Sequence, residues 1–477
     1  MGGLDPLDVA DTQSAGYDIA ITGGTVVVAG RGAVEADIAV SGETIAAIVE
    51  PGTSLEATEH IDASGRVVMP GVIDSHVHWG YKGDFVEQCR ADSRAALVGG
   101  TTTVHLLQRA EPDGYPRAIE QASEVTSVDF FMTPSVFDTD TSRIVPDAVT
   151  EWGCPSIKFY LAYRDLPDAP SGDDWNMLTD GLWLEALASM GEAGASLACV
   201  HAENPEVINH AWPVASARDD GGLRAWEAAH PEIGEVEAIL RSALYAEESS
   251  VALYLVHLSG ARSVEALERA RATWPFVYGE TCPHYLIHNV EDSSQEVKFS
   301  PPVRQPRDNE VLWDALASGV LDCVGSDSAS TRRAAKVGGA FESMRGGPGQ
   351  GTLLPVVLSE GVNTGRLTVE RAAEVTSTNA ARIFGLYPQK GVIEVGADAD
   401  LVVVDLDLER TPSHELLGTW SDHNLYADRT LRGWPVLTML RGRVVCRELD
   451  VLAEAGSGRY LKRAPQQGLG RLPGTER

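Results

Sequence analysis

The chain has 477 residues, 43% of them hydrophobic and only 6% aromatic, so it can bury a large core and form more than one structural unit. Its 69 acidic and 38 basic residues give a formal net charge of -31, which repels phosphate backbones and anionic lipid and so argues against nucleic acid and membranes as partners. No run approaches about 18 apolar residues, and no basic leader with an apolar core opens the chain, so we expect neither membrane insertion nor export. Six scattered cysteines without a C-x-x-C pair favour a reducing, cytoplasmic setting.

Both ends of the chain have a β-like pattern. Near the start, the runs 19–28 and 36–45 are rich in β-branched residues and contain turn signals, and the runs 396–405 and 436–445 repeat this pattern near the end. We therefore predict that segments 1–69 and 391–450 combine into one flanking β-sandwich domain. Residues 451–477 form a basic tail, which we expect either to contact a neighbouring subunit or to be disordered.

The middle segment, 70–390, alternates short β-rich runs with helix-like stretches. The stretches 181–190 and 263–271 show the helical pattern clearly. Repeated strand-then-helix units over roughly 300 residues are typical of a parallel α/β domain. The sequence predicts a (β/α)8 TIM-like barrel with insertions.

A pair of histidines ends the first apolar run of this segment. In Gly71-Val-Ile-Asp-Ser-His-Val-His-Trp79, His76 and His78 are two residues apart. Side chains at i and i+2 on a strand point the same way, so both imidazoles can reach one metal ion. Two polar residues on the wet face of a strand would give the same pattern, so the pair needs further ligands to count as a site.

Further ligands are found where later apolar runs end. Five strand-like runs follow, and four of them place a candidate ligand on or just after the strand: Lys158, His201, His257 and Asp327. Each of these alone is explained as well by a core histidine or a loop-capping carboxylate. Because the carboxyl ends of barrel strands meet at one face, their joint occurrence predicts a single site there.

A series of short motifs in this order resembles one family. The motifs are Pro70-Gly-Val-Ile-Asp-Ser-His-Val-His78, Gly99-Gly-Thr-Thr-Thr103, Ser156-Ile-Lys-Phe-Tyr160, Val200-His-Ala-Glu-Asn204, Val256-His-Leu-Ser259, Gly279-Glu-Thr-Cys-Pro-His-Tyr285, Phe299-Ser-Pro-Pro-Val-Arg304, Gly325-Ser-Asp327, Asn379-Ala-Ala-Arg-Ile-Phe-Gly-Leu386 and Lys390-Gly-Val-Ile-Glu-Val-Gly-Ala-Asp-Ala-Asp-Leu401. Together they resemble the cyclic amidohydrolases of the amidohydrolase superfamily, most closely the hydantoinase/dihydropyrimidinase branch.

The resemblance implies a binuclear centre with two Zn²⁺ ions per subunit. One ion would take His76, His78 and Asp327 and the other His201 and His257, with N6-carboxylated Lys158 and a hydroxide shared between them. A protonated lysine is a poor ligand, whereas the carbamate that it forms with CO2 is an anion able to bridge two cations.

The resemblance also implies roles in catalysis. The bridging hydroxide would attack the amide carbonyl of a small cyclic substrate, and the Tyr163 hydroxyl would help to stabilise the oxyanion. Asp327 would carry the proton to the leaving ring nitrogen. Ser300 and the segment around Arg345, where the family often has Asn, would contact the ring through backbone groups.

Several departures from the family pattern leave the substrate open. Ser328 follows the aspartate where histidine is common, the loop 79–85 is short, and 164–175 carries extra residues. We expect hydrolysis of a cyclic imide, ureide or dihydropyrimidine by a cytoplasmic homotetramer. The alternatives are an allantoinase-like enzyme, another amide or carbamate hydrolase on the same barrel, and a non-catalytic binding relative, against which the intact ligand set argues.

Overall fold

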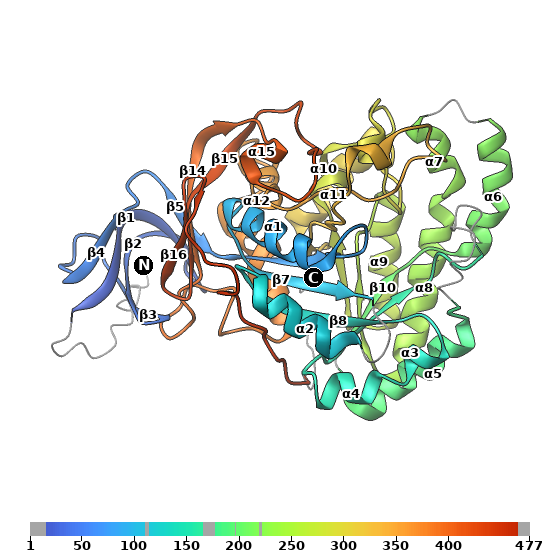
Figure 1. Cartoon of the computed structure of the whole chain (residues 1–477), viewed down its shortest axis with the longest axis horizontal. Coiled ribbons are helices and arrows are strands. Elements are labelled where there is room, and N and C mark those ends of the chain that lie inside the picture. Colours follow the sequence, from blue (N-terminus) through green and yellow to red (C-terminus); the bar gives the residue numbers. More distant parts are fainter. Residues whose placement is uncertain (1–15, 110–113, 166–176, 196, 219–221, 466–477) are drawn as a thin grey trace.

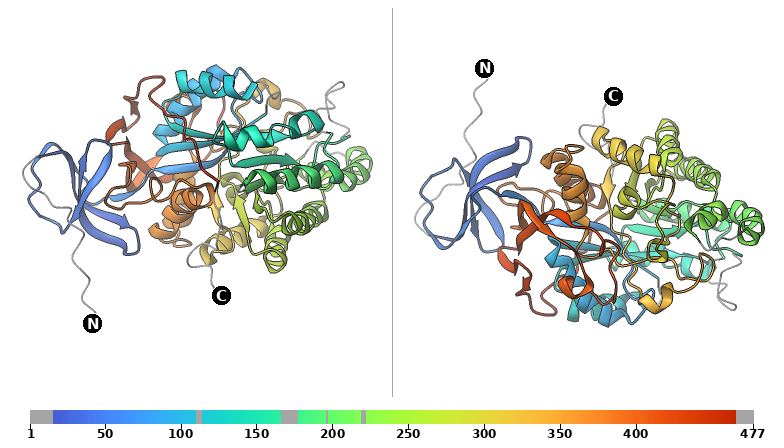
Figure 2. Two further views of the ribbon diagram at one scale, coloured as in Figure 1. Left: turned by 90° about the horizontal axis from the view of Figure 1, so that it is seen from below. Right: turned by 90° about the horizontal axis from the view of Figure 1, so that it is seen from above.

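The computed structural model describes residues 16–109, 114–165, 177–195, 197–218 and 222–465. It consists of a barrel and a flanking sheet, which lie at opposite ends of an elongated molecule (Figures 1 and 2). Figure 2 shows the N-terminal strands at one end and the green helices of the barrel at the other. Within the described residues, no helix is both long enough and apolar enough to cross a bilayer.

Eight parallel strands form the barrel sheet, in the order β13-β12-β11-β10-β9-β8-β7-β6. Their bounds are β6 Val72–Val77, β7 Thr101–Gln108, β8 Asp129–Val136, β9 Ser156–Tyr160, β10 Leu197–His201, β11 Ala252–Leu255, β12 Val277–Thr281 and β13 Cys323–Val324. A bridge between Val77 and Ser328 joins the first strand to the segment after the last, so the barrel nearly closes. Almost all of these strand residues are buried, as expected for parallel strands covered on both faces.

Helices surround the barrel and connect its strands (Figure 1). The α-helices are α1 Phe85–Val98, α2 Gly114–Val125, α3 Thr139–Ser142, α4 Val145–Thr150, α5 Asp180–Ala193, α6 Pro205–Ala217, α7 Leu223–Ala229, α8 Glu232–Ser249, α9 Ala261–Thr273, α10 Pro283–Ile287, α11 Pro306–Ser318, α12 Leu353–Val356, α13 Val369–Ala373, α14 Asn379–Phe384 and α15 His414–Leu417. Short 3-10 helices span Gln295–Val297 and Arg333–Lys336, and π-helical turns span Val357–Val362 and Glu374–Thr378. The helical patterns at 181–190 and 263–271 lie within α5 and α9, as predicted.

The flanking unit is a nine-stranded mixed sheet built from both ends of the chain. Its strands are β1 Tyr17–Val28, β2 Gly32–Ser41, β3 Thr44–Val49, β4 Ala57–Asp62, β5 Val67–Pro70, β14 Leu401–Arg410, β15 Leu431–Leu440, β16 Arg443–Arg447 and β17 Asp450–Val451. They are ordered β17-β16-β15-β14-β5-β1-β2-β3, with β4 paired to β1. The antiparallel pairing of β5 with β14 joins the N-terminal and C-terminal segments. The predicted fold class is therefore confirmed, and a separate apolar core that includes Ile38, Val68 and Leu401 stabilises this unit.

After β17 the chain returns to the barrel. Tyr460 forms a bridge with Phe130, and the backbone nitrogen of Arg463 donates to the carbonyl of Gly153 at 2.9 Å. Residues 452–465 therefore pack on their own subunit. Residues 466–477 lie outside the described residues, so the predicted contact of the tail with a neighbouring subunit stays a prediction.

Candidate active site

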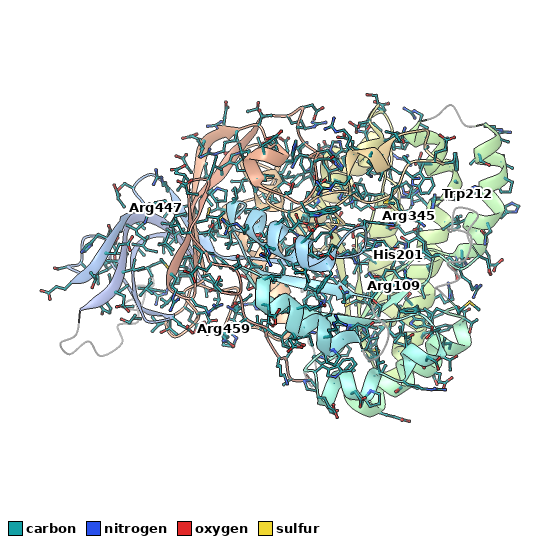
Figure 3. The ribbon with its side chains drawn as sticks, in the orientation of Figure 1. Arg109, His201, Trp212, Arg345, Arg447 and Arg459 are labelled. Atoms are coloured by element: carbon teal, nitrogen blue, oxygen red, sulfur yellow. The ribbon has the colours of Figure 1, made fainter. Side chains whose placement is uncertain are left out.

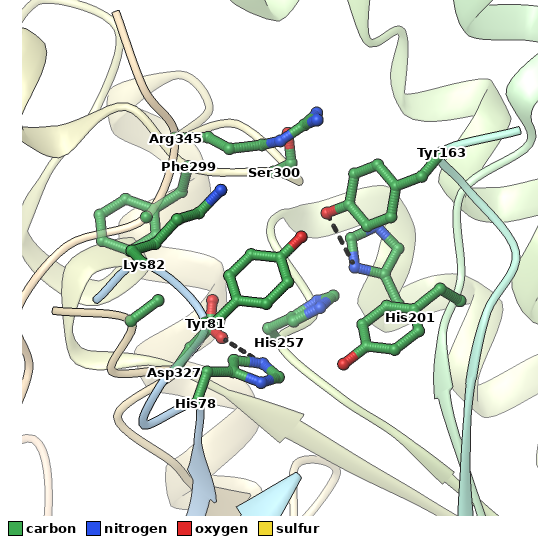
Figure 4. Close-up of a pocket in the computed structure, with 13 residues that line it drawn as sticks. His78, Tyr81, Lys82, Tyr163, His201, His257, Phe299, Ser300, Asp327 and Arg345 are labelled. Carbon is green, nitrogen blue, oxygen red and sulfur yellow. Dashed lines mark hydrogen bonds and ion pairs between the residues drawn. The ribbon is translucent and has the colours of Figure 1, made fainter. Parts of the chain in front are cut away.

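The six predicted ligands lie at or near the carboxyl ends of the barrel strands. They are His76 and His78 at the end of β6, Lys158 on β9, His201 at the end of β10, His257 after β11 and Asp327 after β13. Four of them surround one cavity in Figure 4, which draws His78, His201, His257 and Asp327 around its floor. This is the face at which barrels build active sites.

His76, His78 and Asp327 form a compact triangle. The two Nε2 atoms are 3.0 Å apart, and each lies 3.3 Å from Oδ1 of Asp327. Ligand bonds of about 2.0–2.1 Å at tetrahedral angles place ligand atoms about 3.3 Å apart, so the triangle fits one Zn²⁺ ion. Barrel closure brings Asp327 to the pair, because the backbone nitrogen of His78 donates to the carbonyl of Ser328 at 2.8 Å.

Hydrogen bonds at Nδ1 orient both histidines of this triangle. His76 Nδ1 lies 2.7 Å from Oε1 of Glu280, and His78 Nδ1 lies 3.2 Å from the carbonyl oxygen of Leu107. A proton on Nδ1 leaves the Nε2 lone pair available to a metal ion. Ser75 and Tyr254 donate to the other carboxylate oxygen of Glu280 at 2.5 and 2.7 Å.

The second group of predicted ligands consists of His201, His257 and Lys158. The ring centroids of the two histidines are 4.5 Å apart. Nε2 of His201 lies 2.8 Å from the Glu203 carboxylate, which leaves Nδ1 to face the cavity, with the Tyr163 hydroxyl 3.5 Å away. Among the described residues, neither Nζ of Lys158 nor Nδ1 of His257 has a hydrogen-bond partner, so both atoms could bind a metal ion or another group.

Burial sets the protonation states that such a centre requires. It holds the pKa of His201 and His257 well below the usual range, so both rings are neutral. It also lowers the pKa of Lys158 to about 8, which leaves part of this amine neutral near pH 7. A neutral amine is the form that reacts with CO2, so these residues fit a centre bridged by a carboxylated lysine.

Three of these residues have a left-handed backbone. The φ angles are +70° at Tyr163, +46° at His257 and +47° at Asp327. Residues other than glycine adopt this conformation rarely, because it costs about 1–3 kcal/mol unless the surroundings impose it. The fold therefore maintains backbone strain where these side chains turn into the cavity.

A cavity of about 490 Å³, including its opening to solvent, lies above the ligands. Tyr163, Ser300 and Arg345, the predicted substrate contacts, all line it. Figure 3 shows that Arg345 and His201 lie in the barrel, remote from Arg447 of the flanking sheet.

Comparison with known proteins agrees with this architecture. The model of the amidohydrolase family matches residues 282–445. A D-hydantoinase from Geobacillus stearothermophilus is 35% identical, with 93% of this chain and 96% of that protein covered. An allantoinase from Rubrobacter xylanophilus is 33% identical, with 95% and 99% covered. This chain belongs to the hydantoinase/dihydropyrimidinase branch of the amidohydrolases.

The fold of this amidohydrolase also agrees with solved structures. The crystal structure of a dihydropyrimidinase from Brevibacillus agri is 30% identical to it and superposes with a TM-score of 0.85. The comparison covers 94% of this chain and 99% of the dihydropyrimidinase. The likeness extends through the barrel and the flanking sheet alike.

The structure places the loop 79–85 and part of the stretch 164–175, where the sequence departs from the family pattern. In the loop 79–85, Trp79 is buried, and Tyr81 and Lys82 are the residues that line the cavity. In the stretch 164–175, Arg164 lines a separate cavity beside Leu178 and Glu206, and residues 166–175 lie outside the described residues. Tyr81 and Lys82 therefore contribute to the wall of the cavity.

Two acidic residues that contact the predicted ligands, Glu203 and Glu280, lie within the sequence motifs but have no role in the prediction. Glu280 lies 204 positions from His76 along the chain, so no local pattern could reveal their contact. One signal was Gly325, which precedes Ser326 and Asp327. A Cβ at this position would collide with the Glu280 carboxylate, so a larger residue would displace it.

Proposed function

We propose that this amidohydrolase is a zinc-dependent enzyme that opens the amide bond of a cyclic imide, ureide or dihydropyrimidine. The observation that carries the proposal is the triangle of His76, His78 and Asp327 beside Lys158 at the floor of a small-molecule cavity. Hydantoinase and dihydropyrimidinase relatives at 30–35% identity over most of the chain support the same activity.

Two Zn²⁺ ions per subunit are part of the proposal. One would be held by His76, His78 and Asp327, the other by His201 and His257, with both contacting N6-carboxylated Lys158. When bound, the ions would polarise the substrate carbonyl and activate water as the nucleophile.

The chain's own residues would position the substrate and move protons. The Tyr163 hydroxyl would donate a hydrogen bond to the developing oxyanion, and burial raises its pKa, which keeps that proton in place. The Asp327 carboxylate would accept a proton from water and pass it to the leaving ring nitrogen. Backbone groups of Ser300 and of the Arg345 segment would hold the ring, since Ser300 and Arg345 both line the cavity.

Ring-opening assays test this proposal. Metal-replete protein should hydrolyse at least one of a panel of 5-substituted hydantoins, dihydrouracil and allantoin, with product formation followed by chromatography. Turnover of allantoin alone would favour the allantoinase alternative, which the Rubrobacter relative at 33% identity supports. Absence of turnover on every cyclic substrate would contradict the proposal and favour a binding role.

A cytoplasmic homotetramer completes the proposal. All six cysteines are buried free thiols, which suits a reducing compartment. Light scattering after size exclusion should give four times the mass of one chain. The mass of a single chain would refute the proposed tetramer but would not bear on the proposed activity.

A further inference from the structure

The ends of two sequence motifs meet at one buried arginine. The first motif contains Ser300 and ends at Arg304, and the second contains His257 and ends at Ser259. Ser300 and His257 both line the cavity (Figure 4). Nε of Arg304 donates to Oγ of Ser259 at 3.0 Å. One side chain therefore joins the segment of a predicted metal ligand to the segment of a predicted substrate contact.

The guanidinium of Arg304 also binds two further groups. Its Nη1 donates to the carbonyl oxygen of His230 at 2.6 Å, and its Nη2 donates to Oε2 of Glu235 near the start of α8 at 3.1 Å. The Glu235 carboxylate in turn accepts from the backbone nitrogen of Ser259 at 3.0 Å and from its hydroxyl at 2.5 Å. Arg304, Glu235 and Ser259 thus bind one another in a closed set, which we call the Arg304 cluster.

The Arg304 cluster is shielded from water. The side chains of Arg304 and Glu235 are 1% and 2% exposed, and Ser259 is buried as well. A hydrogen bond that is lost here leaves a buried polar group without a partner, which costs more than the same loss at the surface. The cluster is therefore a rigid link between the segments that it joins.

The segment of His257 needs such a link because its backbone is strained. His257 has a φ of +46°, a conformation that a residue with a side chain keeps only when its surroundings impose it. The Glu280 carboxylate accepts from the backbone nitrogen of His257 at 3.3 Å, and the Arg304 cluster holds Ser259 two residues further on. Bonds at both positions therefore restrain the direction of the His257 ring.

The segment of Ser300 is held on both sides as well. Nε1 of Trp226 donates to the carbonyl oxygen of Phe299 at 2.6 Å, and the hydroxyl of Tyr285 donates to that of Pro301 at 2.6 Å. These bonds fix the backbone around Ser300. Arg304, four residues after Ser300, then sets the position of this backbone relative to His257.

We infer that Arg304 is a positioning residue, which holds His257 in the direction required to bind a metal ion and keeps the Ser300 segment in a fixed position beside it. The inference rests on the proposed function, because it concerns the proposed metal centre. The hydrogen bonds of Arg304 go to Ser259, His230 and Glu235, and none of these belongs to the triangle of His76, His78 and Asp327. Arg304 should therefore affect the ion of His201 and His257 and spare the ion of the triangle.

Zinc titration of metal-free protein against a chromophoric chelator tests the inference. The unaltered protein should bind two ions per chain. Arg304→Lys keeps the charge but loses the planar fork, so it cannot make all three bonds. It should weaken the binding of one ion by about 10- to 100-fold and leave the other unchanged. A purely structural role would lower the free energy of unfolding without this selective change.

Two further variants locate the effect. Ser259→Ala removes one hydroxyl and keeps the bond between Arg304 and Glu235, so it should weaken the same ion by a smaller factor. Its result decides if Arg304→Lys fails to fold. In His257→Ala, the ion that His257 would bind is already weakened, so adding Arg304→Lys should cause little further loss of zinc affinity.

Arg271 provides a matched control at the opposite end of the barrel. Its guanidinium also makes three kinds of bond, to the carbonyl oxygens of Val277 and Val320 and to the carboxylate of Asp322. Val277 begins β12, whereas the predicted ligands lie at or near the carboxyl ends of the strands. Arg271→Lys should therefore leave the affinity for both ions unchanged.

Several outcomes would overturn the inference. They are unchanged affinity for both ions in Arg304→Lys, equal weakening of both ions, and the same selective loss in Arg271→Lys. Unchanged affinity in Ser259→Ala would overturn it if Arg304→Lys does not fold. In all of these cases the unaltered protein still binds zinc, so the proposed function stands. If the unaltered protein binds no zinc, the proposed metal centre fails and the inference fails with it.

Discussion

Glu280 fixes the orientation of the His76 ring and so the direction in which its Nε2 can bind a metal ion. Its Oε1 lies 2.7 Å from His76 Nδ1 and also accepts a bond from the backbone nitrogen of His257 at 3.3 Å. Glu280 therefore contacts one predicted ligand of each group, His76 through its ring and His257 through its backbone. Such partners fix the orientation of ligating histidines and increase their basicity.

We expect Glu280→Gln to weaken zinc binding by about 10- to 100-fold above pH 8, because burial raises the pKa of Glu280 to about 8 and only the ionised carboxylate has the charge that polarises His76, which the amide lacks. Titration of metal-free protein against a chromophoric chelator measures the change. Asp92→Asn is a matched control, since Asp92 is equally buried but bonds to Ser330 and Trp420 instead. Equal zinc affinity in Glu280→Gln and the unaltered protein would contradict this role.

Substitution of Lys158 can separate an effect on the stability of the metal-free protein from an effect on metal binding. Its Nζ is buried and lacks a hydrogen-bond partner among the described residues, so the desolvation cost of its charge outweighs its contact with the Tyr160 ring. We expect Lys158→Met to leave the unfolding midpoint of metal-free protein unchanged or higher. Its metal content should fall well below two ions per chain, and ring opening should be lost.

Metal analysis and urea unfolding of the same preparations test this pair of effects. Full activity in Lys158→Met would refute the assignment of Lys158 as a bridging ligand. A large fall in the stability of the metal-free variant would instead indicate a structural role.

At the scale of elements, Lys390 connects strand β8 of the barrel to the segment that leads into strand β14 of the flanking sheet. Its buried ammonium lies 2.9 Å from the carboxylates of Asp129 and Asp398 and 2.6 Å from that of Asp400. Asp129 begins β8, whereas Asp400 directly precedes β14. The three surrounding carboxylates raise the pKa of Lys390 above its usual value despite burial, so it stays charged.

We expect Lys390→Met to destabilise the protein by about 3–5 kcal/mol, because it leaves buried carboxylates without their cation. Urea unfolding at pH 7 measures the loss. Arg447→Met provides the comparison, since its ion pair with Glu59 is half-exposed and should contribute less than about 1 kcal/mol. Equal effects of the two substitutions would show that the Lys390 cluster does not hold the two units together.

The site residues that the sequence predicts best are those at or just after the carboxyl ends of barrel strands. A strand that ends at a histidine must point it at the carboxyl face of the barrel, so His76, His201 and Asp327 could be grouped from pattern and order. Loop geometry was not predictable, because Tyr81 and Lys82 reach the cavity only through the turn after β6. Contacts such as Glu280 with His76 depend on closure of the whole barrel and leave no local signal.

At the scale of the whole molecule, the C-terminal segment crosses the barrel at the end opposite the site. The backbone nitrogen of Phe130, near the start of β8, donates to the carbonyl of Arg459 at 2.9 Å, and that of Leu461 donates to the carbonyl of Phe130 at 2.8 Å. Arg463 follows and is 5% exposed, with its guanidinium 4.5 Å from the centroid of Phe131. Residues at this end of a barrel usually serve stability.

Arg463 links the last described segment to two neighbouring barrel strands. Its Nη2 donates to the carbonyl of Met132 on β8 at 2.9 Å and to Oγ of Ser156 on β9 at 2.8 Å. We expect Arg463→Ala to lower the free energy of unfolding by about 2–4 kcal/mol, because it opens a cavity and leaves both acceptors without this donor. Lys462→Ala, at the exposed neighbouring position, should change it by less than about 0.5 kcal/mol. Urea unfolding of both variants measures these changes. Equal free energies of unfolding in the two variants would show that the C-terminal segment contacts the barrel without stabilising it.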